Sequence, residues 1–456
     1  MKAPSPVIES DAPVFGADAR ARLSGIAESA LAAAREQGVG AAEAAAHLSQ
    51  GLAVTVRMGE VETLEQTRDK GLSVTVYFGK RSGSASTTDL SPAAVRDTVR
   101  AACTIARYTA EDPCAGLADP ERLARSIPDL DLLHPWNPPV ERAIELAREC
   151  EAAALAVDPR ITNSEGGSLS SYEGVEVYAN THGFIGTSAG TRHNLSAAVI
   201  AQDESGMQRD YWFTVSRRPD GLESAAAVGE RSAQRALRRL GARKLTTRRA
   251  PVIYEAPVAA SLLSHFVGAV RGESLYRGAS FLIDHLGKEI FPPHVRIHEQ
   301  PHLKGALGSA PFDNEGVATA PRDLVRAGVL QGYVLDSYSA RKLKMQTTGN
   351  AGGVHNLTID PGPRGLQELL KQMGTGLLVT ELIGFGVNII TGDYSRGAAG
   401  FWVENGEIAY PVEEITIAGN LRDMYRGIVA VGSDVDVRGN IRTGSIWIEG
   451  VTIAGS

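Results

Sequence analysis

The sequence is poor in cysteine, with only Cys103, Cys114 and Cys150 in 456 residues. An odd and sparse set of this kind is not the disulfide framework of a small secreted protein. Cys103 and Cys150 each fall on an apolar face of a predicted helix, so both are expected to be buried structural thiols.

Long hydrophobic runs are also missing. No stretch of about 18 apolar residues could cross a membrane, and the N-terminal segment MKAPSPVIESDAP lacks the apolar region of a secretory signal. We therefore expect no membrane span and a cytoplasmic location. The formal net charge is −7, and an acidic surface argues against a general role in binding nucleic acid.

The first half of the chain alternates between helical and extended patterns. Asp18 and Ser91 are placed to cap helices, and Pro92 suits a first helical turn. The expected helices are Ala19–Gln37, Pro92–Tyr108, Val140–Val157 and Glu223–Leu240. Alternating apolar residues predict a hairpin from Leu52–Arg57 and Leu72–Phe78, and an antiparallel meander over Ile161–Ser216.

The second half begins after a basic stretch, so we place a domain boundary near Ala242–Arg249 and divide the chain into residues 1–241 and 242–456. It has one long predicted helix, Ala256–Val270, and many short strands separated by glycine. This pattern is typical of a barrel or sandwich. The fold class is therefore expected to be α+β, with an N-terminal α/β region and a β-rich C-terminal domain.

The segment HEQPH, residues 298–302, matches the zinc-binding pattern H-E-x-x-H. That pattern needs a helix to place two histidines on one zinc ion, but Pro301 disfavours a helix and the preceding residues alternate like a strand. A strand that ends in a turn with solvent-facing histidines is the favoured interpretation. A metal site made by His294, His298 and His302 remains the alternative.

Two further motifs are weak. G-x-S-x-G at residues 186–190 lacks the following helix that a hydrolase nucleophile requires, so a turn in the meander is favoured. The basic run Arg238–Arg249 has no aromatic residues for stacking on bases. A helix C-terminus followed by a solvated linker explains it best, and a contact with nucleic acid or an acidic partner is the alternative.

A dense polar group, Asp393, Tyr394, Ser395 and Arg396, lies in the glycine-rich segment 392–420. It could line a pocket or form a structural turn, and the residues alone leave both open. The blocks YVLDSYSARKLKMQTTGNAGGVHN, GTGLLVTELIGFGVNIITGDYSRGAAGFWVENGEIAYPVEEITIAGN and TGSIWIEGVTIAG closely resemble the PmbA/TldE branch of the TldD/PmbA metalloprotease family. Segments such as GSASTTDLSP and IARYTAEDPCAGLADP extend the resemblance over nearly the whole chain.

The resemblance implies a heterodimeric TldD–TldE metalloprotease that processes peptides and small unfolded proteins. In the TldD branch, a helix with H-E-x-x-x-H and a C-terminal cysteine hold the metal. The corresponding positions here are Ser264, His265, Ala269 and Thr443. Because these residues offer too few strong donors, the resemblance implies a chain without its own metal. Zinc or another divalent metal is expected in a TldD-like partner subunit.

This chain would then be a non-catalytic subunit that closes the chamber and helps to hold an extended peptide. The residues expected to face the chamber or the partner are Glu273, Arg277, Asp393, Tyr394 and Arg396. Two alternatives are kept. One is a self-sufficient zinc metallopeptidase that uses His294, His298 and His302, and the other is a regulatory binder of DNA gyrase or nucleic acid.

Overall fold

The computed structural model describes residues 16–455, so the predicted absence of a signal in MKAPSPVIESDAP lies outside the described residues. The chain forms two compact units. The smaller comprises residues 16–50, 67–117 and 174–189, and the larger comprises 51–66, 118–173 and the residues from 190 onward. None of the helices in this described part combines the length and the apolar surface needed to span a bilayer.

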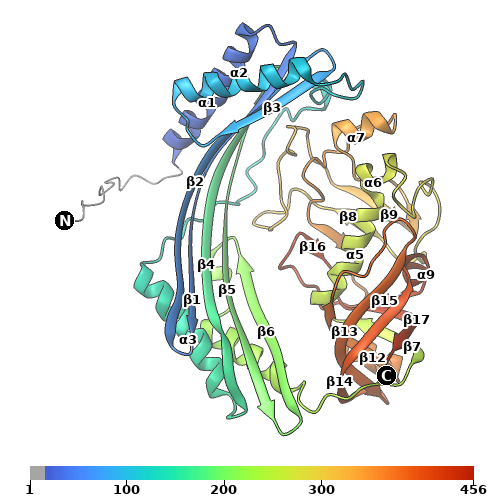
Figure 1. Ribbon diagram of the computed structural model, residues 1–456. Coiled ribbons are helices and arrows are strands. Elements are labelled where there is room, and N and C mark those ends of the chain that lie inside the picture. Colours follow the sequence, from blue (N-terminus) through green and yellow to red (C-terminus); the bar gives the residue numbers. More distant parts are fainter. Residues whose placement is uncertain (1–15, 456) are drawn as a thin grey trace. The chain divides into compact units, whose positions relative to one another are not determined.

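A six-stranded sheet in the order β3-β2-β1-β4-β5-β6 contributes to both units (Figure 1). Its strands are β1 Ala41–Arg57, β2 Glu60–Phe78, β3 Arg81–Thr87, β4 Ile161–Asn180, β5 Ile185–Asp203 and β6 Gly206–Ser216. The predicted meander is thus confirmed. The two runs of the predicted hairpin lie in β1 and β2, but residues 60–71, expected to connect them, belong to strand β2, and the turn is at Met58–Gly59. The buried Glu151 carboxylate accepts the backbone N–H groups of Met58 and Gly59 at the hairpin turn, each at 2.8 Å.

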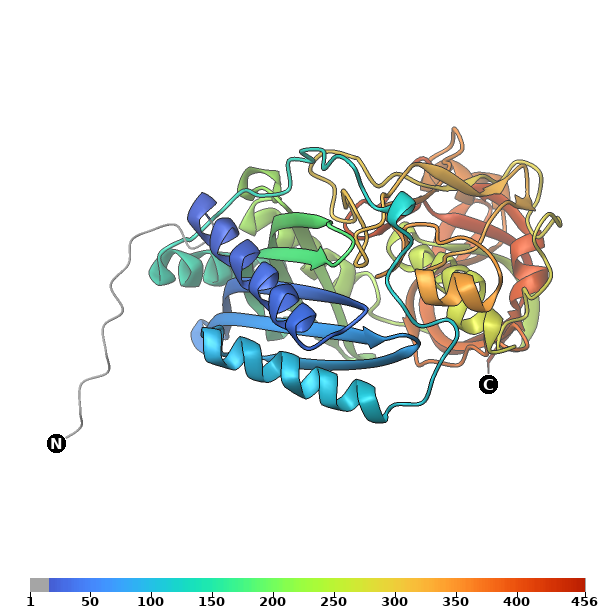
Figure 2. The ribbon, with the colours of Figure 1, turned by 90° about the horizontal axis from the view of Figure 1, so that it is seen from above.

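In the smaller unit, α1 (Ala17–Glu36) and α2 (Pro92–Tyr108) lie side by side against the strands (Figure 2). Helix α2 packs so closely on β3 that a Cβ at Gly83 would lie 2.4 Å from Ala102 O. Ser91 caps α2 as predicted. The predicted Asp18 cap is wrong: α1 begins after Gly16, and Asp18 lies in its first turn, where a carboxylate favours the positive end of the helix dipole.

In the larger unit, α3 (Val140–Ala156) and α4 (Ala225–Leu237) pack together on the sheet, and apolar residues of both helices and of β4, β5 and β6 form a core. Gly229 of α4 permits this close packing, because a Cβ there would lie 2.0 Å from Cys150 O. Cys150 and Cys103 are buried free thiols, as predicted.

The C-terminal part contains two more sheets. Strands β14-β13-β12-β7-β17 form a ring that is closed by pairing between β14 and β17, and β15 extends it. A second sheet has the order β10-β9-β8-β11-β16. The α+β prediction with a barrel-like C-terminal region is therefore confirmed. The ring and its extension consist of β7 Arg248–Tyr254, β12 Gly376–Ile383, β13 Asp393–Glu404, β14 Glu407–Asn420, β15 Ile428–Val431 and β17 Ile446–Ala454.

The remaining elements of this part are short apart from one helix. Helix α5 has the predicted bounds, Ala256–Val270. The others are α6 Gly272–Tyr276, β8 Ile297–Glu299, β9 Arg322–Arg326, β10 Val329–Leu330, α7 Ser337–Lys342, β11 Leu357–Ile359, α8 Leu366–Met373, α9 Leu421–Arg426 and β16 Ile441–Arg442.

Candidate functional site

Helix α5 is held in place by the strand before it and by two side chains far along the sequence. It follows β7 directly, and Pro257 occupies its first turn, where a missing N–H costs nothing. The side chain of the N-cap residue Glu255 accepts no hydrogen bond from the first helical N–H groups. Instead, the Ser445 hydroxyl accepts the Ala256 N–H at 3.1 Å. The Tyr425 hydroxyl donates to Leu262 O at 2.9 Å, which fixes the middle of α5.

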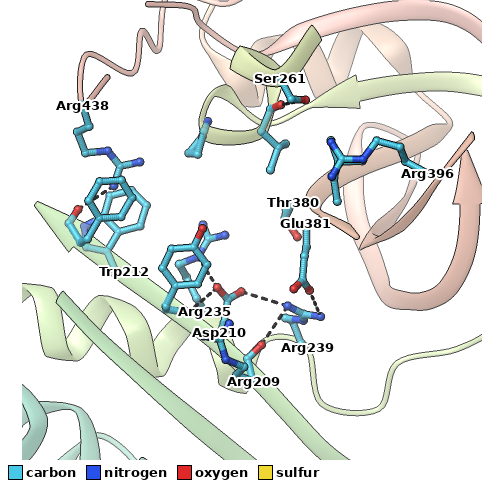
Figure 3. A pocket seen from close by; sticks show the side chains of 15 residues that line it. Arg209, Asp210, Trp212, Arg235, Arg239, Ser261, Thr380, Glu381, Arg396 and Arg438 are labelled. Atoms are coloured by element: carbon cyan, nitrogen blue, oxygen red, sulfur yellow. Dashed lines mark hydrogen bonds and ion pairs between the residues drawn. The ribbon is translucent and has the colours of Figure 1, made fainter. Parts of the chain in front are cut away.

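A cavity of about 270 Å³ opens beside α5, and its walls come from β6, α4, α5, β12 and β13 (Figure 3). Its lining combines aromatic and apolar side chains with many arginines. The labelled lining residues are Arg209, Asp210, Trp212, Arg235, Arg239, Ser261, Thr380, Glu381, Arg396 and Arg438. A concave site with an apolar wall and a few converging polar groups is the usual form of a ligand site.

Ion pairs build the floor of this cavity. Arg235 bridges Asp210 and Glu255, with both N–O distances at 3.1 Å. Arg239 reaches Glu381 at 2.6 Å, and Figure 3 shows the Glu381 carboxylate turned toward Arg239. Because these groups are largely withdrawn from water, their charges hold one another more strongly than surface pairs do.

His265 lies one helical turn after Ser261 on α5. Its ring meets the Tyr394 ring edge-on at a centroid distance of 6.1 Å. Burial, and then the nearby positive charge of Arg396, lower the pKa of His265 to about 4. The imidazole is therefore neutral at pH 7, and its buried Nε2 has no hydrogen-bond partner.

Two buried tyrosines lie beside His265 and Arg396. The Tyr254 and Tyr394 hydroxyls are buried, and burial raises the pKa of both, for Tyr254 well above its usual value. The two hydroxyls are close enough to affect each other's pKa, yet neither has a partner with full hydrogen-bond geometry. Buried polar atoms without partners are rare in proteins and commonly mark functional positions.

Sequence profiles of one family match three segments that together cover most of the chain. The profiles are described as the PmbA/TldA metallopeptidase domain 1, central domain and C-terminal domain, and they match residues 42–106, 133–240 and 247–455. The chain belongs to the PmbA/TldD family. Metalloprotease PmbA of Escherichia coli O157:H7 is 52% identical, with 94% of this chain and 96% of that protein covered.

Other members of the PmbA/TldD family are more distant. A metalloprotease TldD homologue of Haemophilus influenzae is 25% identical, with 65% of this chain and 66% of that protein covered. A crystal structure from Bacteroides thetaiotaomicron, described as a candidate modulator of DNA gyrase, superposes with a TM-score of 0.90 at 31% identity. The match covers 95% of this chain and 99% of that one.

The positions that the sequence resemblance assigns to the metal ligands of the TldD branch do not form a ligand set here. Ser264 is exposed, Ala269 is fully buried and has no donor atom, and Thr443 is buried with its hydroxyl donating to Gly444 O at 2.8 Å. Over residues 16–455, no three His, Cys, Asp or Glu side chains lie close enough together to hold an ion. The donors present therefore do not fit a divalent metal.

The structure brings together only some of the residues predicted to face a chamber or partner. Tyr394 and Arg396 lie beside His265. Asp393 points elsewhere: it is exposed and accepts hydrogen bonds from Thr391 and Asn420, which lower its pKa. Glu273 and Arg277 form an exposed ion pair of 3.0 Å on α6 and do not line the cavity.

The HEQPH segment is strand β8 followed by a turn, as favoured from the sequence. The predicted solvent-facing orientation is wrong for His298, which is buried and pairs with Asp360 at 2.8 Å. His294 and His302 are exposed, and His302 contacts the Thr319 hydroxyl at 3.0 Å. Each histidine thus lies in a different setting, and they do not converge on one point.

One prediction of irregular structure is wrong. G-x-S-x-G lies within strand β5 rather than in a turn, and His193 is buried against Ser171 at 3.0 Å. The basic run begins at the C-terminus of α4, as favoured from the sequence. Its first arginines are engaged with the protein: Arg239 is buried, and Arg238 pairs with Glu255 at 3.7 Å.

Asp210, Arg235 and Thr380 were not predicted from the sequence. A weak signal existed for Asp210, since this acidic residue directly precedes the aromatic run Tyr211–Phe213. Thr380 lies at a β-bulge, where the register between β12 and β13 shifts from Val379 to Glu381. Bulges change the direction of side chains, and no pattern in the sequence predicts the bulge at Thr380.

Proposed function

We propose that this chain is the non-catalytic, TldE-like subunit of a heterodimeric TldD–TldE metallopeptidase in the cytoplasm. The observation that carries the proposal is the donor-poor helix α5, where the positions of metal ligands hold Ser264 and Ala269. Without three strong donors, a chain cannot bind the ion that activates water for peptide hydrolysis.

The partner subunit would be a TldD-like chain that supplies the metal, the general base and the third ligand. The present chain would close the reaction chamber and help to hold an extended peptide by strand addition. Its much greater identity to PmbA than to the TldD homologue supports its place in the TldE branch. Peptides and small unfolded proteins are the proposed substrates.

The test compares this chain alone, a TldD-like subunit alone and their equimolar mixture on a fluorogenic peptide, with and without a chelator. We expect cleavage that is sensitive to the chelator only when the TldD-like subunit is present, and strongest in the mixture. Co-purification of the two chains at equal stoichiometry is the second expected result. Chelator-sensitive cleavage by this chain alone would falsify the proposal.

Elemental analysis of the purified chain separates the proposal from a self-sufficient zinc enzyme. We expect far less than one zinc ion per chain, and no change on His298→Ala. Near-stoichiometric zinc that disappears in His298→Ala would instead establish a site at His294, His298 and His302.

The alternative of a nucleic-acid binder depends on the basic run Arg238–Arg249. Its first two residues, Arg238 and Arg239, already pair with carboxylates.

A further inference from the structure

The charges around the cavity leave one arginine without a counterion. Four of the five arginines that line it have a carboxylate partner: Arg209 pairs with Glu165, Arg235 with Asp210, Arg239 with Glu381 and Arg438 with Asp436. The Arg396 side chain has no ion pair or hydrogen bond among residues 16–455, and its Nε is buried without a partner. A half-buried guanidinium without a counterion is costly unless an anion completes it.

The groups that face Arg396 do not supply that anion. Its neighbours are the neutral His265 and the tyrosines Tyr254 and Tyr394, whose pKa values are raised by burial. The carboxylate on the neighbouring strand belongs to Glu381 and is turned toward Arg239 (Figure 3). The positive charge therefore remains directed at the cavity.

A second polar group lies in the same cavity and is also without a partner. Thr380 is only 5% exposed, and its Oγ1 forms no hydrogen bond. Thr380 lies at the bulge in β12 and lines the cavity together with Ser261 and Arg396 (Figure 3). A buried hydroxyl that donates to nothing in the protein is available to donate to a ligand.

We propose that Arg396 and Thr380 form a binding site for a carboxylate within the cavity beside α5. The planar guanidinium offers parallel N–H donors that match the two oxygens of a carboxylate, and the Thr380 hydroxyl adds a third donor. A cavity of about 270 Å³ exceeds what a carboxylate alone would fill. The apolar wall of Trp212, Val258 and Leu382 contacts the residue that carries the carboxylate.

The assignment of this carboxylate to a peptide rests on the proposed function. It is either the terminal carboxylate of a peptide or the side chain of an aspartate or glutamate. Binding is measured with this chain alone, without a TldD-like subunit and without cleavage. A failure here therefore leaves the proposed function intact, and an inactive mixture of subunits leaves the measured affinity unchanged.

The experiment uses three fluorescent, N-acetylated peptides of one neutral sequence and the purified full-length chain. The first has a free C-terminus, the second a C-terminal amide, and the third an amide and one internal glutamate. We expect at least one carboxylate peptide to bind at least tenfold more tightly than the uncharged amide. The free-terminus and glutamate arms identify the source of the carboxylate.

Arg396→Gln is expected to abolish that tenfold preference, and Thr380→Val to reduce it several-fold. Arg277→Gln is the matched control, since it removes an exposed arginine outside the cavity and is expected to keep the preference. Equal binding of all three peptides, or a preference that survives Arg396→Gln, overturns the site. If Arg396→Gln does not fold, Thr380→Val decides, and an unchanged preference in that variant overturns the site.

Discussion

The guanidinium of Arg239 contacts the Glu381 carboxylate at 2.6 Å. Arg239 follows helix α4, and Glu381 lies in strand β12, so the pair joins the segment that matches the central family domain to the segment that matches the C-terminal domain. Arg239 also donates to Arg209 O at 3.0 Å. One side chain thus fixes β6 and β12 on the same side of the cavity.

We expect Arg239→Met to lower the free energy of unfolding by about 2–4 kcal/mol, because it removes a cation from Glu381 and from Asp210, which lies 3.6 Å from Arg239. A double-mutant cycle with Glu381→Gln should give a coupling energy of about 1–2 kcal/mol in urea titrations. The exposed pair Glu273–Arg277 is the control, with an expected coupling of about 0.3–0.5 kcal/mol. Additive effects of Arg239→Met and Glu381→Gln would show that the pair contributes nothing as a pair.

Gly229→Ala should destabilise the protein, because its Cβ would lie 2.0 Å from Cys150 O in the contact between α3 and α4. We expect a loss of about 1–3 kcal/mol, as for other overpacked positions. Gly25 in helix α1 is the matched control, since a Cβ there meets nothing within 4 Å. Gly25→Ala should raise stability by up to about 1 kcal/mol through helix propensity. Similar melting temperatures for the two variants would contradict this packing argument.

His265 should make stability depend on pH in mildly acidic solution. Its pKa is about 4 in the folded chain, against an ordinary value of 6.5, so the unfolded chain binds more protons between these values. Stability must then fall as pH drops through this window, by up to about 3 kcal/mol in total. We expect His265→Asn to flatten the curve of unfolding free energy against pH between about 4 and 6.5. A variant curve parallel to that of the wild type would rule out this role of His265.

Glu315 should act in the opposite direction. Burial, together with the nearby carboxylates of Asp313 and Asp336, raises the pKa of Glu315 to about 7 from 4.5, although hydrogen bonds from Ser337 oppose this. The folded chain binds more protons between pH 4.5 and 7, so its stability falls as pH rises through that range, by about 3 kcal/mol.

Glu315→Gln should therefore gain stability relative to the wild type as pH increases from 4.5 to 7. Glu273→Gln, at an exposed position, is the control and should show no such trend. The check is chemical denaturation at several pH values, and a constant difference between Glu315→Gln and the wild type would refute it.

Local patterns determined the elements whose contacts are mainly local. The bounds of α5 and the Ser91 cap of α2 followed from apolar spacing, proline position and a capping hydroxyl. The strand character of HEQPH followed from one proline and the alternation before it. The family, and the shortage of donors at Ser264 and Ala269, were likewise visible in the amino-acid sequence, because a missing donor atom does not depend on the fold.

Tertiary structure decided most of the candidate site, although Tyr394 and Arg396 were predicted from the sequence. Arg239 lies at the end of the predicted helix Glu223–Leu240, and only the approach of β12 makes it a buried partner of Glu381. A register shift between β12 and β13 places Thr380 at a bulge beside the cavity. Arg396 lacks a counterion because the carboxylates around the cavity already pair with other arginines. Charge compensation between residues about 140 positions apart in the chain, such as Arg239 and Glu381, leaves no periodic trace, since it depends on distances that only folding creates.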